Sequence, residues 1–554
     1  MDWWGGGAPL GRRPGTSDGS WRGPARPDDA HYLESPLFAP RLQRTTRLAM
    51  VLVLLAAVGY AIFLVDGAAR GDAVLYGCLV TAELLLLTNV AAMWITALSD
   101  EGDSWENAAV RQTRVDLVEG SYAPSIDVLV TAFGEPLEVL ARTILAARDL
   151  RLPHQTYVCD DGRSDAVRDL CAELAVGYLR RADRDGVKAG NVNRALARTS
   201  GDFVALFDAD HAPHPDFLLL TVPHMARREL AFVQLPQAYL LDGAGFVERA
   251  SAESQQLFYE VICPGKNRYD AAFHVGTNAL FRRRALEEVG GFFEDTHSED
   301  IWTSIRLHQR GWSSLYLPHV IARGLSPATV YAYFRQQFRW ASGSFEILLR
   351  SNPLVINGLT AGQRLAYSAP PLNYLTAFAN GFYLLLPPLF LLFGIAPLNT
   401  DAPHWLAAYL PFLLLTHVVL ALQSGGFRWR PILLSVVTVP VHLQAFFAVL
   451  VRRRPEWLST NSSVAVPSAV EVMLPQLVMV AFNIAAIAVG LSAVGDPVAT
   501  FVSVGLCAVH SLAMLAVAGV AGLDRIRARR AARPGRRGGR RPHRTEFVLE
   551  SSAA

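Results

Sequence analysis

Apolar runs on both sides of one long polar block constrain this chain more than any other feature. Six of the runs are each long enough to cross a bilayer as a helix. They lie at about 48–65, 73–98, 366–395, 405–423, 475–494 and 497–522. The sequence therefore predicts an α-helical bundle of about six membrane spans, with a large domain inserted between the second and the third.

A seventh apolar run, residues 431–451, differs from the others. It contains Pro440, His442 and Gln444, and the three residues directly after it, 452–454, are all arginine. Amphipathic helices with basic flanks commonly lie along the membrane surface. We therefore expect an interfacial helix here and not a seventh span.

The arginines indicate which side of the membrane each part occupies. Seven arginines precede the first run and ten follow the last, whereas the loops 66–72 and 396–403 and the turn at Gly495 together hold one basic residue, Arg70. Basic residues accumulate on the cytoplasmic side of membrane proteins. We therefore expect a multi-pass protein of the cell (plasma or inner) membrane with both termini and the inserted domain in the cytoplasm.

Two polar residues, Glu83 and Asn89, lie inside the second apolar run. Polar groups are costly in the hydrocarbon region, so each needs a partner or a function. One interpretation is hydrogen bonding between helices, and the other is that they line a polar path across the membrane.

The composition sets broad limits on the class of protein. Of the 554 residues, 51% are hydrophobic and 18% charged, which excludes a disordered protein and one that coats nucleic acid. The five cysteines are scattered, so we expect neither a disulfide framework nor a zinc site. Only two of the 51 basic residues are lysines, Lys188 and Lys266, and a lysine kept in such a chain can have a role that arginine cannot fill.

The block between the second and third spans, residues 99–364, has a different pattern of apolar and polar residues. Short apolar runs at 125–133, 155–160 and 201–208 end in polar turns, and segments with helical spacing lie between them. Strands alternating with helices predict a mostly parallel α/β sheet. Ligands of such sheets bind at the carboxyl ends of the strands.

Acidic residues lie at these strand ends. Asp160 and Asp161 follow the second strand, and Asp208 and Asp210 follow the third. Alternation along a strand places Asp208 and Asp210 on one side, where two close carboxylates favour a divalent cation with oxygen ligands. The alternative for both pairs is an acidic turn without a ligand.

Two further segments have ordinary explanations when each is considered alone. Glu299 and Asp300 precede a helical segment, where acidic residues stabilise a helix N-terminus. Residues 335–347 form an amphipathic, basic and aromatic helix, which commonly anchors a protein to a membrane.

In combination, these segments resemble the processive family 2 glycosyltransferases, most closely the catalytic subunits of bacterial cellulose synthases. The family pattern is an aspartate after the second strand, D-x-D, T-E-D and Q-x-x-R-W, and it occurs here in that order, with a serine in place of the threonine of T-E-D. The matching residues are Asp160-Asp161-Gly162, Asp208-Ala209-Asp210, Ser298-Glu299-Asp300 and Gln336-Gln337-Phe338-Arg339-Trp340, supported by 131–136, 188–196 and 275–292.

The resemblance implies a cytosolic GT-A (Rossmann-like) domain that uses a UDP-sugar donor. Residue by residue, it implies that Thr131, Glu135 and Asp161 hold the uridine, with Asp160 supporting them. It also implies that Lys188 contacts the nucleotide or the sugar.

The same resemblance assigns the cation and the base. Asp208 and Asp210 would bind Mg²⁺ or Mn²⁺ and the diphosphate, and Asp300 would be the general base. Inverting transfer needs one carboxylate to take the proton of the acceptor hydroxyl as this hydroxyl attacks the sugar.

The remaining implied site residues belong to the helical segment 335–347. Gln336 and Arg339 would face the diphosphate and the acceptor, and Trp340 would stack on the terminal sugar of the growing polysaccharide. Positive charge near the diphosphate neutralises the leaving group.

The sequence also departs from the family pattern. The family's F-C-G-S is replaced by residues 274–277, His-Val-Gly-Thr, and the gating-loop pattern F-x-V-T-x-K has only an aromatic residue and Thr460 in the candidate gating loop 457–462. Only 32 residues follow Gly522, too few for a PilZ barrel, so we expect no direct binding of cyclic di-GMP.

The sequence therefore predicts a membrane-embedded polymerase of a cellulose-like β-glucan. A chitin- or hyaluronan-like polymer, a non-processive enzyme that glycosylates a lipid, and a transporter or scaffold with an inactive domain stay open. Expected partners are the UDP-sugar, the growing polysaccharide and membrane lipids, with a periplasmic or extracellular accessory protein left open and no nucleic acid.

The expected parts are a disordered cytosolic tail (1–46), two spans (47–98), the GT-A domain (99–350), interfacial helices with spans three and four and the candidate gating loop (351–470), spans five and six (471–522), and an Arg-rich cytosolic tail (523–554).

Overall fold

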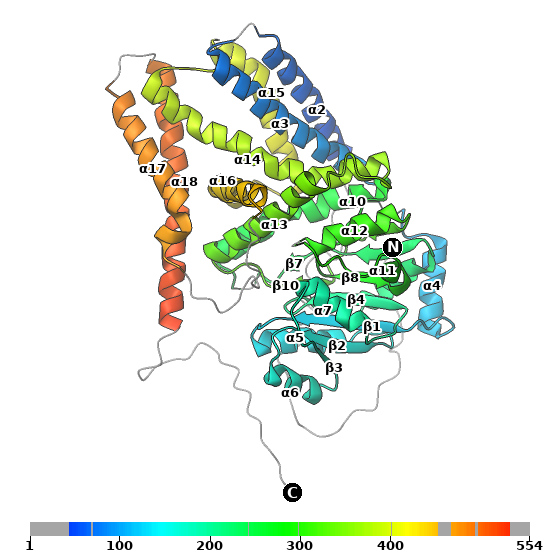
Figure 1. Ribbon diagram of the computed structural model, residues 1–554. Coiled ribbons are helices and arrows are strands. Elements are labelled where there is room, and N and C mark those ends of the chain that lie inside the picture. Colours follow the sequence, from blue (N-terminus) through cyan, green and yellow to red (C-terminus); the bar gives the residue numbers. More distant parts are fainter. Residues whose placement is uncertain are drawn as a thin grey trace.

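The computed structural model has two parts, a domain built on a β-sheet and a group of long apolar helices (Figure 1). It describes residues 44–531 except 68–69, 103, 242, 297, 400–401, 453–466 and 493–496. The candidate gating loop, nearly all of the expected N-terminal tail and residues 532–554 of the expected C-terminal tail lie outside the described residues.

The sheet has seven strands in the order β3-β2-β1-β4-β8-β6-β9. Six strands run in one direction and β8 runs against them, since it pairs antiparallel with both β4 and β6. This confirms the mostly parallel sheet. The strands are β1 (Ile126–Ala132), β2 (Gln155–Asp160), β3 (Gly177–Arg180), β4 (Phe203–Asp208), β6 (Leu230–Gln234), β8 (Ala279–Arg282) and β9 (Ser313–Tyr316).

Helices cover both faces of the sheet because successive strand residues point to opposite sides. Val128 and Val130 of β1 belong to a core with one set of helices, and Leu129 belongs to a core with the other set. The first set is α4 (Ala108–Glu119), α5 (Leu137–Arg148), α6 (Asp165–Glu173), α8 (Phe217–Thr221) and the 3₁₀-helix η1 (Val222–Ala226). The second set is α7 (Val187–Leu196), α11 (Arg283–Glu288) and α12 (Glu299–Gln309).

Short elements connect the sheet to the apolar helices. A second, three-stranded sheet has the order β5-β10-β7. Its strands are β5 (Ala212–Pro213), β7 (Ala238–Tyr239) and β10 (Ala322–Gly324). The short helices are α9 (Phe246–Leu257), the π-helix η2 (Phe258–Ile262), α10 (Cys263–Gly265) and the 3₁₀-helix η3 (Lys266–Tyr269).

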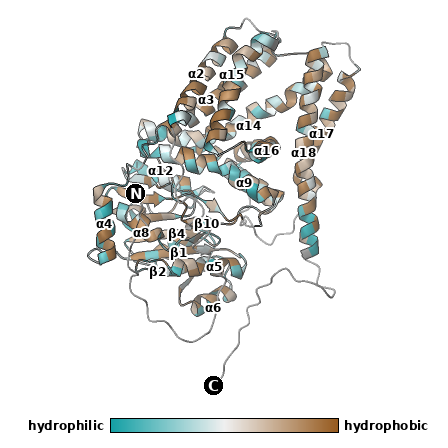
Figure 2. Cartoon of the chain, turned by 180° about the vertical axis from the view of Figure 1, so that it is seen from behind, coloured by the Kyte–Doolittle hydropathy of each residue, from teal (hydrophilic) through white to brown (hydrophobic). Residues whose placement is uncertain are grey.

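Seven described helices are long and apolar enough to cross a membrane. They correspond to the six predicted spans and the seventh apolar run, and Figure 2 shows that hydrophobic residues, in brown, predominate along them. They are α2 (Arg44–Val65), α3 (Ala73–Leu98), α14 (Ala361–Phe393), α15 (Ala402–Gln423), α16 (Trp429–Leu450), α17 (Ala469–Gly490) and α18 (Pro497–Ala531).

The helix α16 is oriented differently from the other six. Figure 1 shows it nearly end-on between α13 (Val330–Arg350) and α14, whereas α17 and α18 are seen along their length. This orientation supports the interfacial position that the sequence predicts, which stays a prediction.

Two helices differ in length or surroundings from the sequence-based expectation. The helix α13 is longer than the predicted amphipathic segment, and its apolar side is buried in cores shared with α16. The helix α18 continues to Ala531, past the predicted end of the span at residue 522. Its final turns are hydrophilic and extend toward the sheet domain (Figure 2).

Candidate active site

All the predicted site residues except Asp160 meet in one cavity at the carboxyl ends of β1, β2 and β4. The cavity has a volume of about 220 Å³. Among the residues that line it are Thr131, Glu135, Asp161, Lys188, Asp208, Asp210, Asp300, Gln336, Arg339 and Trp340.

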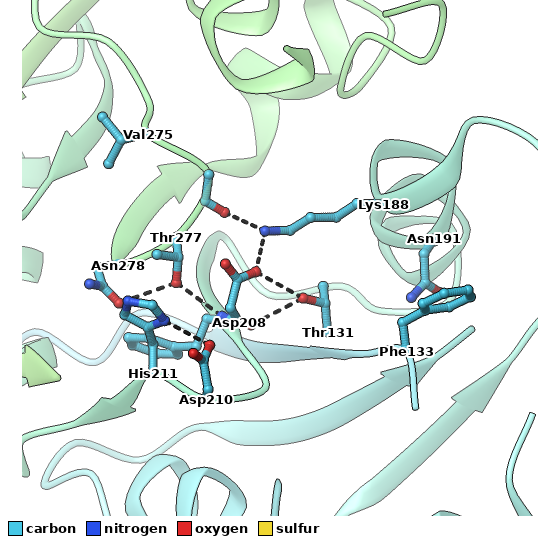
Figure 3. A network of polar contacts seen from close by, with 12 residues as sticks. Thr131, Phe133, Lys188, Asn191, Asp208, Asp210, His211, Val275, Thr277 and Asn278 are labelled. Atoms are coloured by element: carbon cyan, nitrogen blue, oxygen red, sulfur yellow. Dashed lines mark hydrogen bonds and ion pairs between the residues drawn. The ribbon is translucent and has the colours of Figure 1, made fainter. Parts of the chain in front are cut away.

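Asp208, the last residue of β4, is the centre of a polar network (Figure 3). Its Oδ1 accepts hydrogen bonds from the Lys188 ammonium and from Thr131 Oγ1, the latter at 3.2 Å. Thr131 is the Cα partner of Asp208 in the β1–β4 register. Thr277 Oγ1 accepts from the backbone N–H of Asp208 at 2.9 Å. The carboxylate is therefore fixed at the strand end.

Lys188 reaches Asp208 from the first turn of α7 and also donates to the Gly276 carbonyl at 2.6 Å (Figure 3). Burial lowers the pKa of Lys188, but the carboxylates of Asp208 and Glu299 outweigh it and the pKa is raised overall. The ammonium is therefore a permanent positive charge in the cavity.

Asp210 and His211 lie beside Asp208 and complete a group that can hold a cation. One ligand atom from each of the three residues lies within 4.8 Å of the others. His211 Nδ1 is 3.0 Å from Asp210 Oδ1, and the backbone N–H of Leu325 donates to Asp210 Oδ2 at 3.1 Å. Two carboxylates and one imidazole suit a divalent cation such as Mn²⁺.

Asp160 and Asp161 have internal partners in the structure. Asp160 accepts from the backbone of Gly162 and Ser164 and does not belong to the cavity lining, so it supports the turn. Asp161 lines the cavity, but both its oxygens pair with the buried Arg181, at 2.5 and 2.8 Å. Its predicted contact with uridine stays a prediction.

Glu135 and Arg339 line the cavity from two different elements, the turn after β1 and the helix α13. Glu135 accepts from the backbone N–H of Phe133 at 2.6 Å, and burial raises the pKa of its carboxyl. Arg339 follows Gln336 by three residues and precedes Trp340 on α13, so all three share one helix face. The cavity thus combines carboxylates on the sheet with a guanidinium on α13.

Asp300 lies in the first turn of α12, where the backbone N–H of Ile301 donates to its Oδ1 at 2.8 Å. Burial, followed by repulsion from Glu299, raises the pKa of Asp300 to about 7. Gly276 lies opposite with φ +95°, and a Cβ there would be 3.6 Å from Asp300 Oδ2. A carboxyl with such a pKa is suited to accept a proton near neutral pH.

A second cavity of about 400 Å³ continues from the first toward the apolar helices. Asp300, Trp340, Gln237 and Val275 line both cavities. The second cavity is also lined by Asn89 and Thr96 of α3, Asn373 and Tyr374 of α14, and His442 of α16.

The two polar residues of α3 therefore have different surroundings. Asn89 lines the second cavity, as the polar-path interpretation expects. Glu83 instead accepts hydrogen bonds from Tyr60 at 3.0 Å and from Tyr383, as the helix-to-helix interpretation expects.

Sequence reasoning assigned no role to three residues that complete the site. His211 follows the D-x-D directly, and Glu299 contributes charge that acts on both Lys188 and Asp300. Their positions within the motifs could have indicated them. Arg181 could not have been found from its position, because its pairing with Asp161 depends on the β2–β3 register.

The sheet, its acidic edge and the attached apolar helices have the architecture of a GT-A domain joined to a membrane part. The comparisons with known proteins agree with this class. The protein-family model described as "Glycosyl transferase family group 2" matches residues 203–450 of this chain. The chain is similar to family 2 glycosyltransferases, and among them to the catalytic subunits of bacterial cellulose synthases.

Two relatives give the extent of this relationship. "Putative cellulose synthase 2" of Komagataeibacter xylinus is 33% identical over 359 residues, which cover 63% of this chain and 23% of the relative. The UDP-forming cellulose synthase catalytic subunit of Pseudomonas fluorescens is 32% identical over 314 residues, covering 55% and 42%. The matched region therefore spans less than half the length of either relative.

A solved structure shows the fold. A mannosyltransferase of Pyrobaculum calidifontis, in complex with GDP-Man and Mn²⁺, covers 68% of this chain and 100% of its own, with a TM-score of 0.50 and 16% identity. At this identity the likeness concerns the fold alone.

Proposed function

We propose that this protein is an inverting, UDP-sugar-dependent glycosyltransferase that extends a β-linked, cellulose-like glucan and passes it through its own helices. The observation that carries the proposal is that Asp300 and Trp340 line both cavities. In this proposal Asp300, as the base, and Trp340, as the acceptor platform, would lie between a donor cavity and a path toward the membrane helices.

The chemistry follows from the residue types. Asp300 takes the proton of the acceptor hydroxyl while this oxygen forms a bond to C1 of the donor sugar. The bond from C1 to the diphosphate breaks on the opposite face, and Lys188 and Arg339 neutralise the charge that develops on UDP. Trp340 offers an apolar face on which the terminal sugar is positioned.

The cation belongs to the same proposal. Asp208, Asp210 and His211 would hold Mg²⁺ or Mn²⁺, which when bound supplies further neutralisation of the diphosphate. The mannosyltransferase with the same fold was solved with Mn²⁺, which supports this assignment. The name of the Pseudomonas relative, a UDP-forming enzyme, supports UDP as the nucleotide.

The orientation of the protein is also part of the proposal. The Arg-rich ends of the sequence favour a catalytic domain on the cytoplasmic side. The second cavity would then lead the product from the cytoplasm into the membrane helices. An extracellular accessory protein would receive the product on the other side.

Product analysis tests the proposed function. The purified full chain in lipid nanodiscs is supplied with Mn²⁺ and labelled UDP-sugars, and both UDP release and product size are measured. We expect product of high molecular mass that β-glucanase digests when UDP-glucose is the donor. A short product that extracts into organic solvent would contradict processive synthesis and favour the glycolipid alternative. UDP release from none of the donors would contradict the proposed function as a whole.

A further inference from the structure

Lys266, the other lysine of the chain, lines the second cavity. It begins η3, and only 2% of its surface is exposed. Burial lowers the pKa of its ammonium to about 8. It is the only lysine or arginine among the residues that line this cavity.

The hydrogen bond of Lys266 has a clear structural origin. Its Nζ donates to the Ala366 carbonyl of α14 at 3.0 Å. Residue 370, whose N–H would normally bond this carbonyl, is a proline and has no N–H. Lys266 therefore satisfies an acceptor that the helix leaves without a partner.

This structural role does not explain the positive charge. A neutral side-chain amide would satisfy the same carbonyl, whereas an ammonium has three donors and a charge that is costly to bury. The Phe273 ring, with its centroid 4.9 Å from Nζ, stabilises the cation partly. Within the described part of the chain, no carboxylate lies within salt-bridge distance of Lys266.

Lys266 differs in charge from most of the other polar residues that line the second cavity. Most of these side chains are amides and hydroxyls, such as Asn89, Asn373 and Thr96, which suit the hydroxyls of a neutral sugar. Asp300 is the only carboxylate in the lining, and it belongs to the catalytic end. The cavity therefore presents one buried cation with no carboxylate of the described chain within salt-bridge distance.

We propose that Lys266 is an anion subsite of the acceptor cavity and binds a carboxylate or phosphate group carried by the acceptor. This inference rests on the proposed function, which makes the cavity the acceptor path. A carboxylate would come from an acidic sugar within the glycan, and a phosphate from a lipid-linked acceptor. Either group would be the counter-ion that the described chain does not supply.

Binding without donor sugar tests this subsite, because it requires no turnover. The full chain in nanodiscs is titrated with two matched pairs, cellobiose against cellobiuronic acid and a polyprenol against its monophosphate. We expect the anionic member of one pair to bind about tenfold more tightly than its neutral counterpart, as a charge-assisted hydrogen bond predicts. The pair that shows the preference identifies the source of the anion.

Three variants separate the charge from the hydrogen bond. Lys266→Gln keeps an N–H donor for the Ala366 carbonyl, so we expect an unchanged melting temperature. It removes the charge, so the affinities for the anionic and the neutral ligand should differ by no more than about twofold. Lys266→Arg keeps the charge and should retain most of the preference. Arg268→Met is the matched control, because Arg268 is exposed and pairs with Glu101. It should behave as the wild type.

Two results would overturn the subsite. One is the absence of an anion preference in the wild type for both pairs, and the other is an undiminished preference in Lys266→Gln. Neither result affects UDP release from UDP-sugars, which tests the proposed function separately.

Discussion

Glu299 and Asp300 are adjacent carboxyls in the first turn of α12, and the charge of Glu299 is one reason why the pKa of Asp300 is raised to about 7. Burial of Asp300 is the larger cause. Two neighbouring carboxyls in a cavity resist simultaneous ionisation, which keeps one of them near the pKa of a base that acts at neutral pH.

The pKa of Asp300 predicts the acidic limb of the pH profile. Because a general base must be deprotonated, the rate of UDP release should fall about tenfold per pH unit below a midpoint near pH 7. The kcat/KM for the UDP-sugar between pH 5 and 9 measures this limb. A rate that stays constant down to pH 5 would contradict the assignment of the base.

Glu299→Gln should move this limb to lower pH. The substitution removes a negative charge beside Asp300, so the pKa of Asp300 falls and the base stays ionised in more acidic solution. Comparison of the two pH profiles detects the shift even if the substitution lowers the maximal rate. An unchanged midpoint would show that the two carboxyls do not interact as the structure indicates.

The proposed cation site at Asp208, Asp210 and His211 predicts a dependence of UDP release on added metal. EDTA should abolish UDP release, and Mn²⁺ should restore it. Asp210→Asn should raise the Mn²⁺ concentration for half-maximal activity at least about tenfold, because it removes one charged ligand. Asp169→Asn serves as the control, because Asp169 is exposed, pairs with Arg168 on α6 and lies outside the cavity lining. Full activity in EDTA would exclude the cation from the mechanism.

Asp524 predicts a connection between the last apolar helix and α13. Its Oδ2 accepts from the backbone N–H of Val330 at 3.0 Å, at the start of the helix that carries Gln336 and Arg339. Asp524→Leu leaves this buried N–H without its acceptor and should cost about 1–3 kcal/mol of stability. Asp524→Asn keeps an acceptor oxygen and should cost less.

The melting temperature and the kcat for UDP release together measure this effect. We expect both to fall in Asp524→Leu, since α13 loses a contact at its first turn. Identical behaviour of Asp524→Leu and the wild type would show that α18 does not help to position α13.

The Glu83 contacts predict a structural role inside the helix bundle. Tyr383→Phe removes a donor to Glu83 from α14, while Tyr60 still donates at 3.0 Å from α2. Hydrogen bonds between membrane helices contribute about 0.6 kcal/mol on average, so a small fall in melting temperature in nanodiscs is expected. The rate of UDP release should stay within about twofold of the wild type. A large loss of activity without loss of stability would instead indicate a polar path at Glu83.

Much of the sheet domain could be predicted from the sequence. The β-branched runs and the acidic residues after them follow the local rules for strands and their carboxyl ends, and Asp208 lies where these rules place it. The reversed strand β8 was not predicted, because its pairing with β4 joins segments about 75 residues apart.

The second cavity lies beyond local sequence patterns for the same reason. Asn89, Lys266 and His442 line it from three elements that are far apart along the chain. The sequence could indicate only that Lys266 is rare and that Asn89 is polar within an apolar run. The partner of Lys266 is a backbone carbonyl 100 residues away, which no side-chain pattern records.

The effect of Asp300→Asn tests the central claim most directly. The substitution keeps the size of the side chain and removes its ability to accept a proton. Sugar transfer from UDP-glucose should fall at least about a thousandfold, while the Kd for UDP in the presence of Mn²⁺ should change less than about threefold. Sugar transfer at a rate close to that of the wild type, with UDP bound normally, would contradict the assignment of Asp300 as the base.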